Sequence, residues 1–296
     1  MSAEIEPAAM ECPICNGSRW KSVEVDGIER LTRCDCWRGA VVDRLMQEAR
    51  VPSRYARCEL ATFEHDMNTQ REAFRRATKF VEAFPAVDKG LLLFGPHGVG
   101  KTHLAVGILK EVVRTKGARG YFFETRELLR LVRDTYNRSV EETEMDVLGP
   151  VLNADLLVLD DLGAERTSEW VQETLGLVVN TRYNARRPTI FTSNLVDSPD
   201  NTDPQGFIFQ LGARTRSRLV EMCDWVEIQG ADVREVGPHA SAEKIAEWQK
   251  NSPASPQNAR RSSNLPPKTK GMARARLKDS GTQFELNWSG GKAGSK

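Results

Sequence analysis

Short apolar runs and stretches of helical periodicity alternate through the middle of the chain. The runs predict strands at residues 91–94, 120–124, 156–159, 188–192 and 224–228. Before and between them, apolar positions spaced three and four apart predict helices at 71–84, 102–115, 127–137, 145–153 and 168–186. The run at 156–159 is continuously apolar, which is typical of a parallel strand buried on both faces. The alternation therefore predicts the α/β class, with a parallel sheet flanked by helices.

The two ends of the chain follow a different pattern. Four closely spaced cysteines lie near the start, and an amphipathic pattern follows them until Pro52 interrupts it. From about Ser241 onward, apart from a short helical pattern at 242–250, the chain is too poor in apolar residues to bury a core. We expect a flexible start, a cysteine module, a linker helix, an α/β domain and a mostly disordered basic tail, at residues 1–9, 10–38, 39–55, 56–235 and 236–296 respectively.

The formal net charge is only +1, but the charge is unevenly spread. Residues 250–296 hold ten of the 42 Lys and Arg and two of the 41 Asp and Glu, so this segment carries +8 and the remainder −7. Such a tail can bind nucleic-acid phosphates, and it can equally serve only to keep the chain in solution. No apolar run approaches the ~18 residues of a membrane span, and no leader pattern precedes residue 10, so we expect a cytoplasmic protein without a membrane partner.

The segment that follows the expected strand 91–94 matches the phosphate-binding pattern G-x-x-x-x-G-K-[ST]. Its residues are Gly95, Pro96, His97, Gly98, Val99, Gly100, Lys101 and Thr102. Glycines let successive backbone N–H groups turn toward a phosphate, and the next helix adds partial positive charge at its N-terminus. We expect Lys101 to reach the β- and γ-phosphates of a nucleotide and Thr102 to hold Mg²⁺. The alternative is a glycine-rich turn with an incidental lysine.

Two carboxylates follow the apolar run at 156–159, at the sheet edge where α/β proteins bind ligands. Asp160 is placed to hold the water shell of Mg²⁺, and Asp161 to orient or deprotonate an attacking water. The alternative is a polar turn with two solvated acids. Glu165, four residues after Asp161, is expected either to contact these acids or to be a solvated loop residue.

Polar residues after the last two expected elements are weaker candidates. Asn194 follows the strand at 188–192, where its amide could sense a γ-phosphate or the attacking water, although Ser-Asn after a strand usually means a turn. Arg214, Arg216 and Arg218 then lie two residues apart. They are either solvated surface charge or a source of an arginine finger for a neighbouring subunit.

These segments together resemble the AAA+ ATPases of the DnaC/IstB type, which are helicase loaders and transposition helper ATPases. The matching segments are 95–102, 156–163, 180–187, 192–194, 212–219 and 230–234, and they span about residues 50–235. The resemblance implies ATP as the nucleotide and a strand order of 5-1-4-3-2, with the core strands numbered along the chain. It also implies ATP-dependent self-association, a sensor role for Asn194, and an arginine finger at Arg218, with Arg214 second. Arg182 and Tyr183 would lie at the subunit interface, although helical periodicity explains them equally well as surface residues.

Cysteines at the N-terminus supply a second signal. Cys12 and Cys15 form C-x₂-C, and Cys34 and Cys36 form C-x-C. This spacing predicts a tetrahedral Zn²⁺ site with a small hairpin between the two pairs, and metal would stabilise a module too short to bury much core. Without a secretory signal, disulfides are the poorer interpretation, and unligated cysteines are the remaining alternative.

The resemblance implies an ATPase that loads a replicative hexameric DNA helicase onto single-stranded DNA. The cysteine module would contact the helicase, and ATP would be hydrolysed at interfaces between copies of the chain. One alternative is an IstB-like transposition helper. The other is a zinc-containing nucleic-acid-binding protein in which ATP acts as a switch with little turnover.

Overall fold

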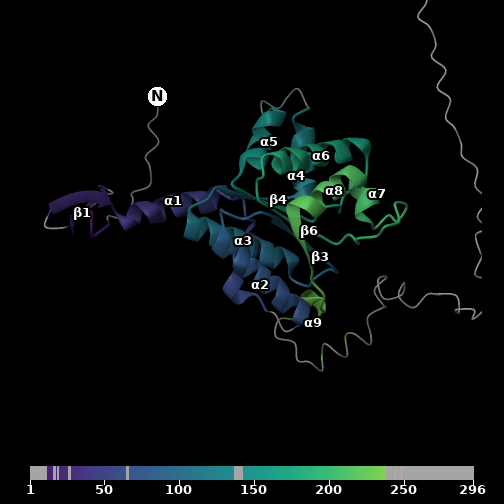
Figure 1. The fold of residues 1–296 in the computed structure, drawn as a ribbon, viewed down its shortest axis with the longest axis horizontal. Helices are drawn as coiled ribbons and strands as arrows, with labels where there is room; N and C mark the ends of the chain where they lie inside the picture. Colours follow the sequence, from purple (N-terminus) through teal and green to yellow (C-terminus); the bar gives the residue numbers. More distant parts are fainter. Residues whose placement is uncertain are drawn as a thin grey trace, which may run out of the picture. The chain divides into compact units, whose positions relative to one another are not determined.

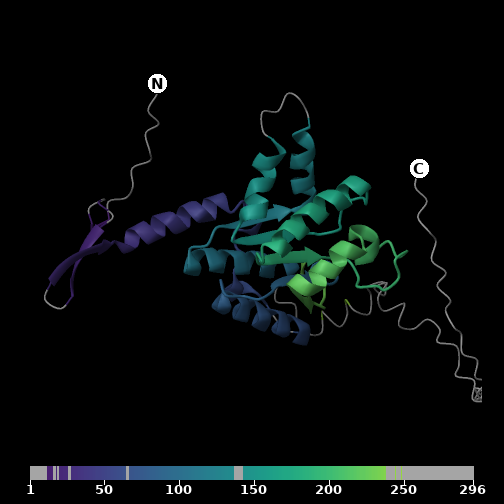
Figure 2. The same ribbon diagram turned by 45° about the horizontal axis from the view of Figure 1, so that its top comes forward.

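The computed structural model describes residues 12–15, 18, 20–25, 28–64, 67–136 and 143–237, together with Lys244 and Trp248. Its centre is a five-stranded sheet with helices on both faces (Figures 1 and 2). The strands are β3 (Gly90–Phe94), β4 (Gly120–Glu124), β5 (Leu156–Asp160), β6 (Thr189–Ser193) and β7 (Cys223–Glu227). The expected tail lies, from residue 238 on, outside the described residues except at Lys244 and Trp248, and so does most of the helix expected at 242–250.

All neighbouring strands of this sheet are parallel, in the order β4-β5-β6-β3-β7. Counted along the chain from the opposite edge, this is 5-1-4-3-2, so the implied order is confirmed. The order places β3 between β6 and β7, with β5 next to β6. The carboxyl ends of β3, β5 and β6, which carry the expected site residues, therefore lie at one edge of the sheet.

Alternate strand residues face two separate hydrophobic clusters. One lies under α2 (Asn68–Ala83) and α3 (Lys101–Lys116), where Leu91, Leu93 and Val158 pack. The other lies under helices on the opposite face, where Leu92 and Phe191 pack. Those helices are α4 (Thr125–Asp134), α5 (Glu144–Asn153), α6 (Glu169–Asn184), α7 (Phe207–Leu211) and α8 (Ala213–Met222). Burial on both faces explains why the strands read as continuous apolar runs.

The cysteine region contains the hairpin expected there. β1 (Trp20–Val25) pairs antiparallel with β2 (Ile28–Arg33). The helix that follows, α1 (Asp35–Glu48), begins four residues before the expected start of the linker helix and includes Cys36 in its first turn. It ends before Pro52, and the 3₁₀ turns η1 (Ser53–Tyr55) and η2 (Leu60–Thr62) lead on toward α2. None of the described helices is long and apolar enough to cross a bilayer.

Arg182 is fully buried, so both sequence-based placements of this residue, at a subunit interface or on the surface, are wrong. Its guanidinium donates to Thr189 Oγ1 at 2.7 Å and to the carbonyls of Val151 (2.9 Å), Ala154 (3.1 Å) and Pro188 (2.7 Å). Burial lowers the pKa of Arg182 to about 9. The residue therefore joins the end of α5 to the start of β6 inside the domain.

Candidate functional site

The phosphate-binding pattern forms a tight loop between β3 and α3. Gly95, Gly98 and Gly100 all have positive φ, at 141°, 71° and 96°, and Gly100 is the left-handed N-cap residue of α3. At Gly95 a Cβ atom would lie 2.1 Å from the carbonyl oxygen of Ile228, so a side chain does not fit there. The loop thus requires glycine at these places, and it leads directly into the helix N-terminus that favours an anion.

Lys101 lies at the base of this loop and is only 6% exposed. Its Nζ donates to the carbonyls of Gly95 (2.9 Å) and Pro96 (2.6 Å) and to Asn194 Oδ1 (2.7 Å). Burial lowers the pKa of Lys101 to about 8. Two of its acceptors belong to the loop itself, so the ammonium is held at the place where phosphates would bind.

Asp160 ends β5 and is 1% exposed. Its Oδ1 accepts hydrogen bonds from Thr102 Oγ1 (2.9 Å) and Thr192 Oγ1 (2.6 Å), while burial raises the pKa of its carboxyl to about 6. A carboxylate and a hydroxyl held together next to a phosphate loop are the oxygen donors that Mg²⁺ prefers. Asp160 and Thr102 therefore fit the magnesium site that the sequence predicted.

Asp161 and Asn194 meet at the same edge of the sheet. The Asp161 backbone N–H donates to Thr192 Oγ1 at 2.9 Å, and Asn194 Nδ2 donates to Asp161 Oδ1 at 3.4 Å. Because Asn194 also accepts from Lys101, its amide bridges the lysine and the second acid. The residues expected from three separate segments are therefore close neighbours.

Sequence reasoning missed Glu124, which ends β4 directly opposite Asp160. The charge of Glu124 contributes to the raised pKa of Asp160, after burial and the charge of Asp161, and Arg54 of η1 lies 3.9 Å from Glu124. An acid at the end of the strand predicted at 120–124 was a usable signal, since the same argument located Asp160. A third carboxylate thus belongs to this edge.

The segment at 230–234, to which the resemblance assigns no role, lies against the phosphate loop. Val233 N–H donates to the Gly98 carbonyl at 3.1 Å, and the Asp232 carboxylate occupies the space where a Gly98 side chain would lie. The charge of Arg234 is among the influences that lower the pKa of Lys101. The segment that follows β7, with the short helix α9 (Val233–Val236), therefore borders the phosphate loop.

The carboxylate of Glu165 is not solvated, so one of the two sequence-based expectations is wrong. Both of its carboxylate oxygens are buried, and no side chain among the described residues hydrogen-bonds them, although the backbone N–H groups of Glu165 and Gly163 lie close enough to lower the pKa of the carboxyl. Burial raises the pKa of this carboxyl, and the neighbouring charge of Asp161 adds a smaller effect in the same direction. The residue is thus neither solvated nor hydrogen-bonded to the two acids.

The three arginines of α8 have different surroundings. Arg216 Nη2 lies 2.6 Å from Asp197 Oδ1, in an ion pair. Arg218 lies over the ring of Tyr183 on α6, 5.9 Å from its centroid, whereas Arg214 is exposed. Among the described residues, Arg216 is therefore the arginine of these three that has an acidic partner.

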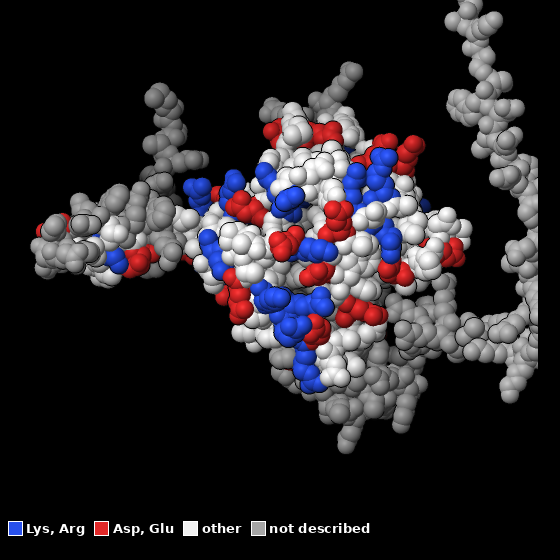
Figure 3. Space-filling view, in the orientation of Figure 1, with Lys and Arg blue, Asp and Glu red and all other residues white. Residues whose placement is uncertain are grey.

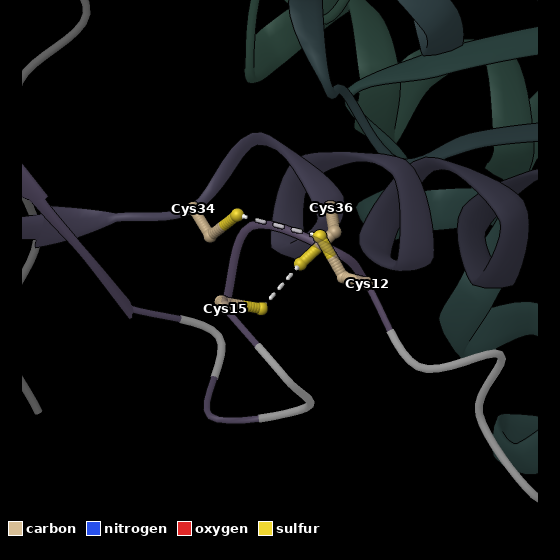
Figure 4. A group of neighbouring side chains, drawn as sticks. All are labelled: Cys12, Cys15, Cys34 and Cys36. Carbon is tan, nitrogen blue, oxygen red and sulfur yellow. Dashed lines mark hydrogen bonds between the residues drawn. The ribbon is translucent and has the colours of Figure 1, made fainter.

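Four cysteine thiols form a compact cluster at the start of α1 (Figure 4). The sulfurs all lie within 4.8 Å of one another, with Cys12 and Cys34 3.8 Å apart and Cys15 and Cys36 3.3 Å apart. These separations are far longer than the ~2.05 Å of a disulfide bond. Sulfurs ~2.3 Å from a tetrahedral Zn²⁺ ion lie ~3.8 Å from each other, so the cluster fits such an ion.

The fold and the sheet-edge site together define a P-loop nucleotide-binding protein of the AAA+ type. A family model described as IstB-like ATP binding protein matches residues 33–238, and the chain belongs to this family.

The chain is also similar to two replicative helicase loaders and to a solved structure of one. The replicative helicase loader DnaI of Bacillus subtilis (strain 168) is 28% identical over 196 residues, which are 64% of this chain and 61% of DnaI. The replicative helicase loader DnaC of Escherichia coli (strain K12) is 24% identical over 157 residues, 53% of this chain and 63% of DnaC. A crystal structure of the DnaC helicase loader has a TM-score of 0.54 and 34% identity, covering 60% of this chain and 100% of that one. The chain thus spans about three fifths of the length of these two curated relatives.

Proposed function

We propose that this protein is an ATP-hydrolysing loader that places a replicative DNA helicase on single-stranded DNA. One observation carries the proposal: the chain is similar to proteins named replicative helicase loaders. The same names favour loading over the alternative of a transposition helper.

The geometry of the site supports a division of roles for ATP hydrolysis. Mg²⁺ held by Thr102 and Asp160 would supply charge neutralisation at the phosphates. Lys101 Nζ donates to the β- and γ-phosphate oxygens, and the loop N–H groups bind the remaining oxygens. Asp161 orients the attacking water and accepts its proton, while the Asn194 amide, between Lys101 and Asp161, holds that water in line with the γ-phosphate.

In this proposal, a second copy of the chain supplies the arginine whose positive charge stabilises the γ-phosphate during hydrolysis. Arg218 contacts Tyr183 on another part of its own subunit, and no ion pair holds it among the described residues. Arg216 is less suited because Asp197 already pairs with it. We therefore retain Arg218 as the finger and Arg214 as the second choice.

Mixing two inactive variants tests this shared site. Lys101→Ala should abolish ATP binding, and Arg218→Ala should bind ATP but turn it over slowly, by roughly 10³-fold if the finger acts as in related ATPases. An equimolar mixture should regain turnover, because the first variant supplies the finger and the second the bound ATP. Turnover in Arg218→Ala equal to wild type, or a mixture no more active than its components, would exclude the shared site.

An exposed aromatic group supports single-stranded DNA as a partner. Tyr136, 57% exposed at the end of α4, packs edge-on against Trp170 of α6 with 6.5 Å between ring centroids, and Arg133 lies 4.7 Å over the Trp170 ring. On the face of the core seen in Figure 3, Lys and Arg are interspersed with Asp and Glu instead of forming one basic surface. Bases of a single strand stack on such aromatic rings, and an arginine beside them adds a cation–π contribution.

Replacing both rings tests the DNA contact. Tyr136→Ala with Trp170→Ala should weaken binding of a fluorescent oligothymidylate by roughly ten-fold or more, since each stacked base contributes ~1–3 kcal/mol. ATP binding should stay unchanged, and Met145→Ala, another exposed apolar residue nearby in the chain, serves as the control. Equal affinities of the double variant and the control would remove these rings from the DNA site.

Capture from native lysate tests the helicase partner. Asp161→Asn, which should hold ATP without turnover, is the bait, and mass spectrometry identifies what it retains. Recovery of a hexameric helicase that is lost when Cys12 and Cys15 are both replaced by Ser would support loading through the cysteine module. Recovery of a transposase, or of nucleic acid alone, would instead favour the alternatives.

A further inference from the structure

Helices α6 and α8 lie side by side, and their surface carries a small polar cluster. The helices approach closely where Gly176 faces Thr215, whose Oγ1 would lie 3.8 Å from a Cβ at Gly176. Farther along, the Tyr183 hydroxyl donates a hydrogen bond of 2.8 Å to Glu221 Oε2. Arg218, three residues before Glu221 on α8, lies over the Tyr183 ring.

The cluster holds Arg218 without neutralising it. Glu221 and Arg218 are spaced for an i, i+3 ion pair, yet the Glu221 carboxylate accepts from Tyr183 instead. In the part of the chain that the structure describes, Arg218 takes no part in an ion pair, in contrast to Arg216 with Asp197. A guanidinium over an aromatic face is oriented but keeps its N–H donors for another acceptor.

Stability alone is a poor explanation for this arrangement. Tyr183 and Arg218 are only partly buried and Glu221 is exposed, and hydrogen bonds or ion pairs between such residues contribute little to folding. Restricting a long arginine side chain before it meets its target, however, reduces the conformational entropy lost on contact. The arrangement thus benefits a reaction that needs Arg218 in one position.

We propose that Tyr183 is a positioning residue for Arg218, and that Glu221 fixes the Tyr183 ring through its hydroxyl. This inference rests on the proposed role of Arg218 at the γ-phosphate of a neighbouring copy. The aromatic ring sets the direction of the guanidinium before subunits meet, and Tyr183 itself does not touch the nucleotide.

Steady-state ATP hydrolysis by the full chain tests the proposal. The protein concentration is chosen so that turnover per subunit no longer rises when more protein is added. Tyr183→Leu should lower kcat about ten-fold with KM for ATP unchanged, because a misplaced catalytic group loses rate without losing ground-state binding. Tyr183→Phe keeps the ring and should lose only about two- to three-fold, as should Glu221→Gln. Asn184→Ala, on the exposed side of α6 next to Tyr183, is the control and should match wild type.

The Arg218→Ala background separates the possible failures. Adding Tyr183→Leu to Arg218→Ala should cause no further loss, since there is then nothing to position. If Arg218→Ala alone slows turnover but Tyr183→Leu does not, the positioning role is wrong while the proposed finger stands. If Arg218→Ala turns over like wild type, the finger itself is wrong. A Tyr183→Leu loss that persists in full without Arg218, or that comes with weaker nucleotide binding or a lower melting temperature, would also overturn the positioning role.

Discussion

The single residue Arg182 joins the end of α5 to the segment before β6. Replacing it by Met removes the donors that satisfy several buried carbonyls of α5 and of the segment before β6. We expect Arg182→Met to lower the free energy of unfolding by about 3–5 kcal/mol, since unsatisfied buried groups are costly. Urea unfolding measures this, with the exposed Arg186→Met as a control expected to stay within ~0.5 kcal/mol. A small effect at Arg182 would mean that water replaces its donors.

Glu165 predicts a dependence of stability on pH. Burial raises its pKa above the ordinary value of 4.5, so the ionised form is disfavoured in the folded chain. The stability present when both states are protonated is lost as pH rises through the folded-state pKa. Glu165→Gln should therefore unfold at higher temperature than wild type at about pH 7.5, with the difference vanishing near pH 4. The exposed Glu173→Gln is the matched control, and a Glu165→Gln difference that is constant with pH would contradict the buried-charge explanation.

A residue's role could be predicted from sequence where its surroundings come from neighbouring positions in the chain. Lys101, Thr102 and Asp160 were predicted because a loop pattern and a strand end are visible in a few consecutive residues. The environment of Arg182 depends on carbonyls about 30 residues earlier, at the end of α5. Glu165 is buried by contacts that no local pattern records. Long-range packing therefore decided the cases in which the expectations were wrong.

Among the elements of the fold, we expect the stability of the cysteine cluster and its hairpin to depend on metal. An isolated two-stranded hairpin is marginal in water, so a bound Zn²⁺ would hold β1 and β2 together. We expect about one Zn²⁺ per chain by elemental analysis. Chelation should raise hydrogen exchange over residues 20–33 while the strand at 90–94 stays protected. Equal protection with and without chelator would show that the hairpin does not need metal.

Charge distribution is a property of the whole molecule, and its effect on DNA binding can be measured by deletion. Removing residues 250–296 leaves a chain with a formal net charge of −7. We expect weaker binding to an oligothymidylate at low salt and a shallower dependence of affinity on salt, because fewer phosphate counterions are released. A full-length variant with Gln at the Lys and Arg positions of this segment should behave like the deletion. Unchanged affinity and slope in both would assign the tail to solubility alone.

The contacts of Ala49 and Tyr55 with β4 have a consequence for shortened forms of the protein. β4 is an edge strand, and the Ala49 carbonyl accepts its Phe122 N–H at 2.8 Å, while the ring of Tyr55 packs 5.8 Å from that of Phe122. A chain begun at residue 56, where the sequence placed the domain boundary, would lack both. Such a chain would leave the edge strand β4 free to pair with strands of other molecules, which is a common route to aggregation. The segment at 49–55, which follows α1, thus also protects this strand from pairing with other molecules.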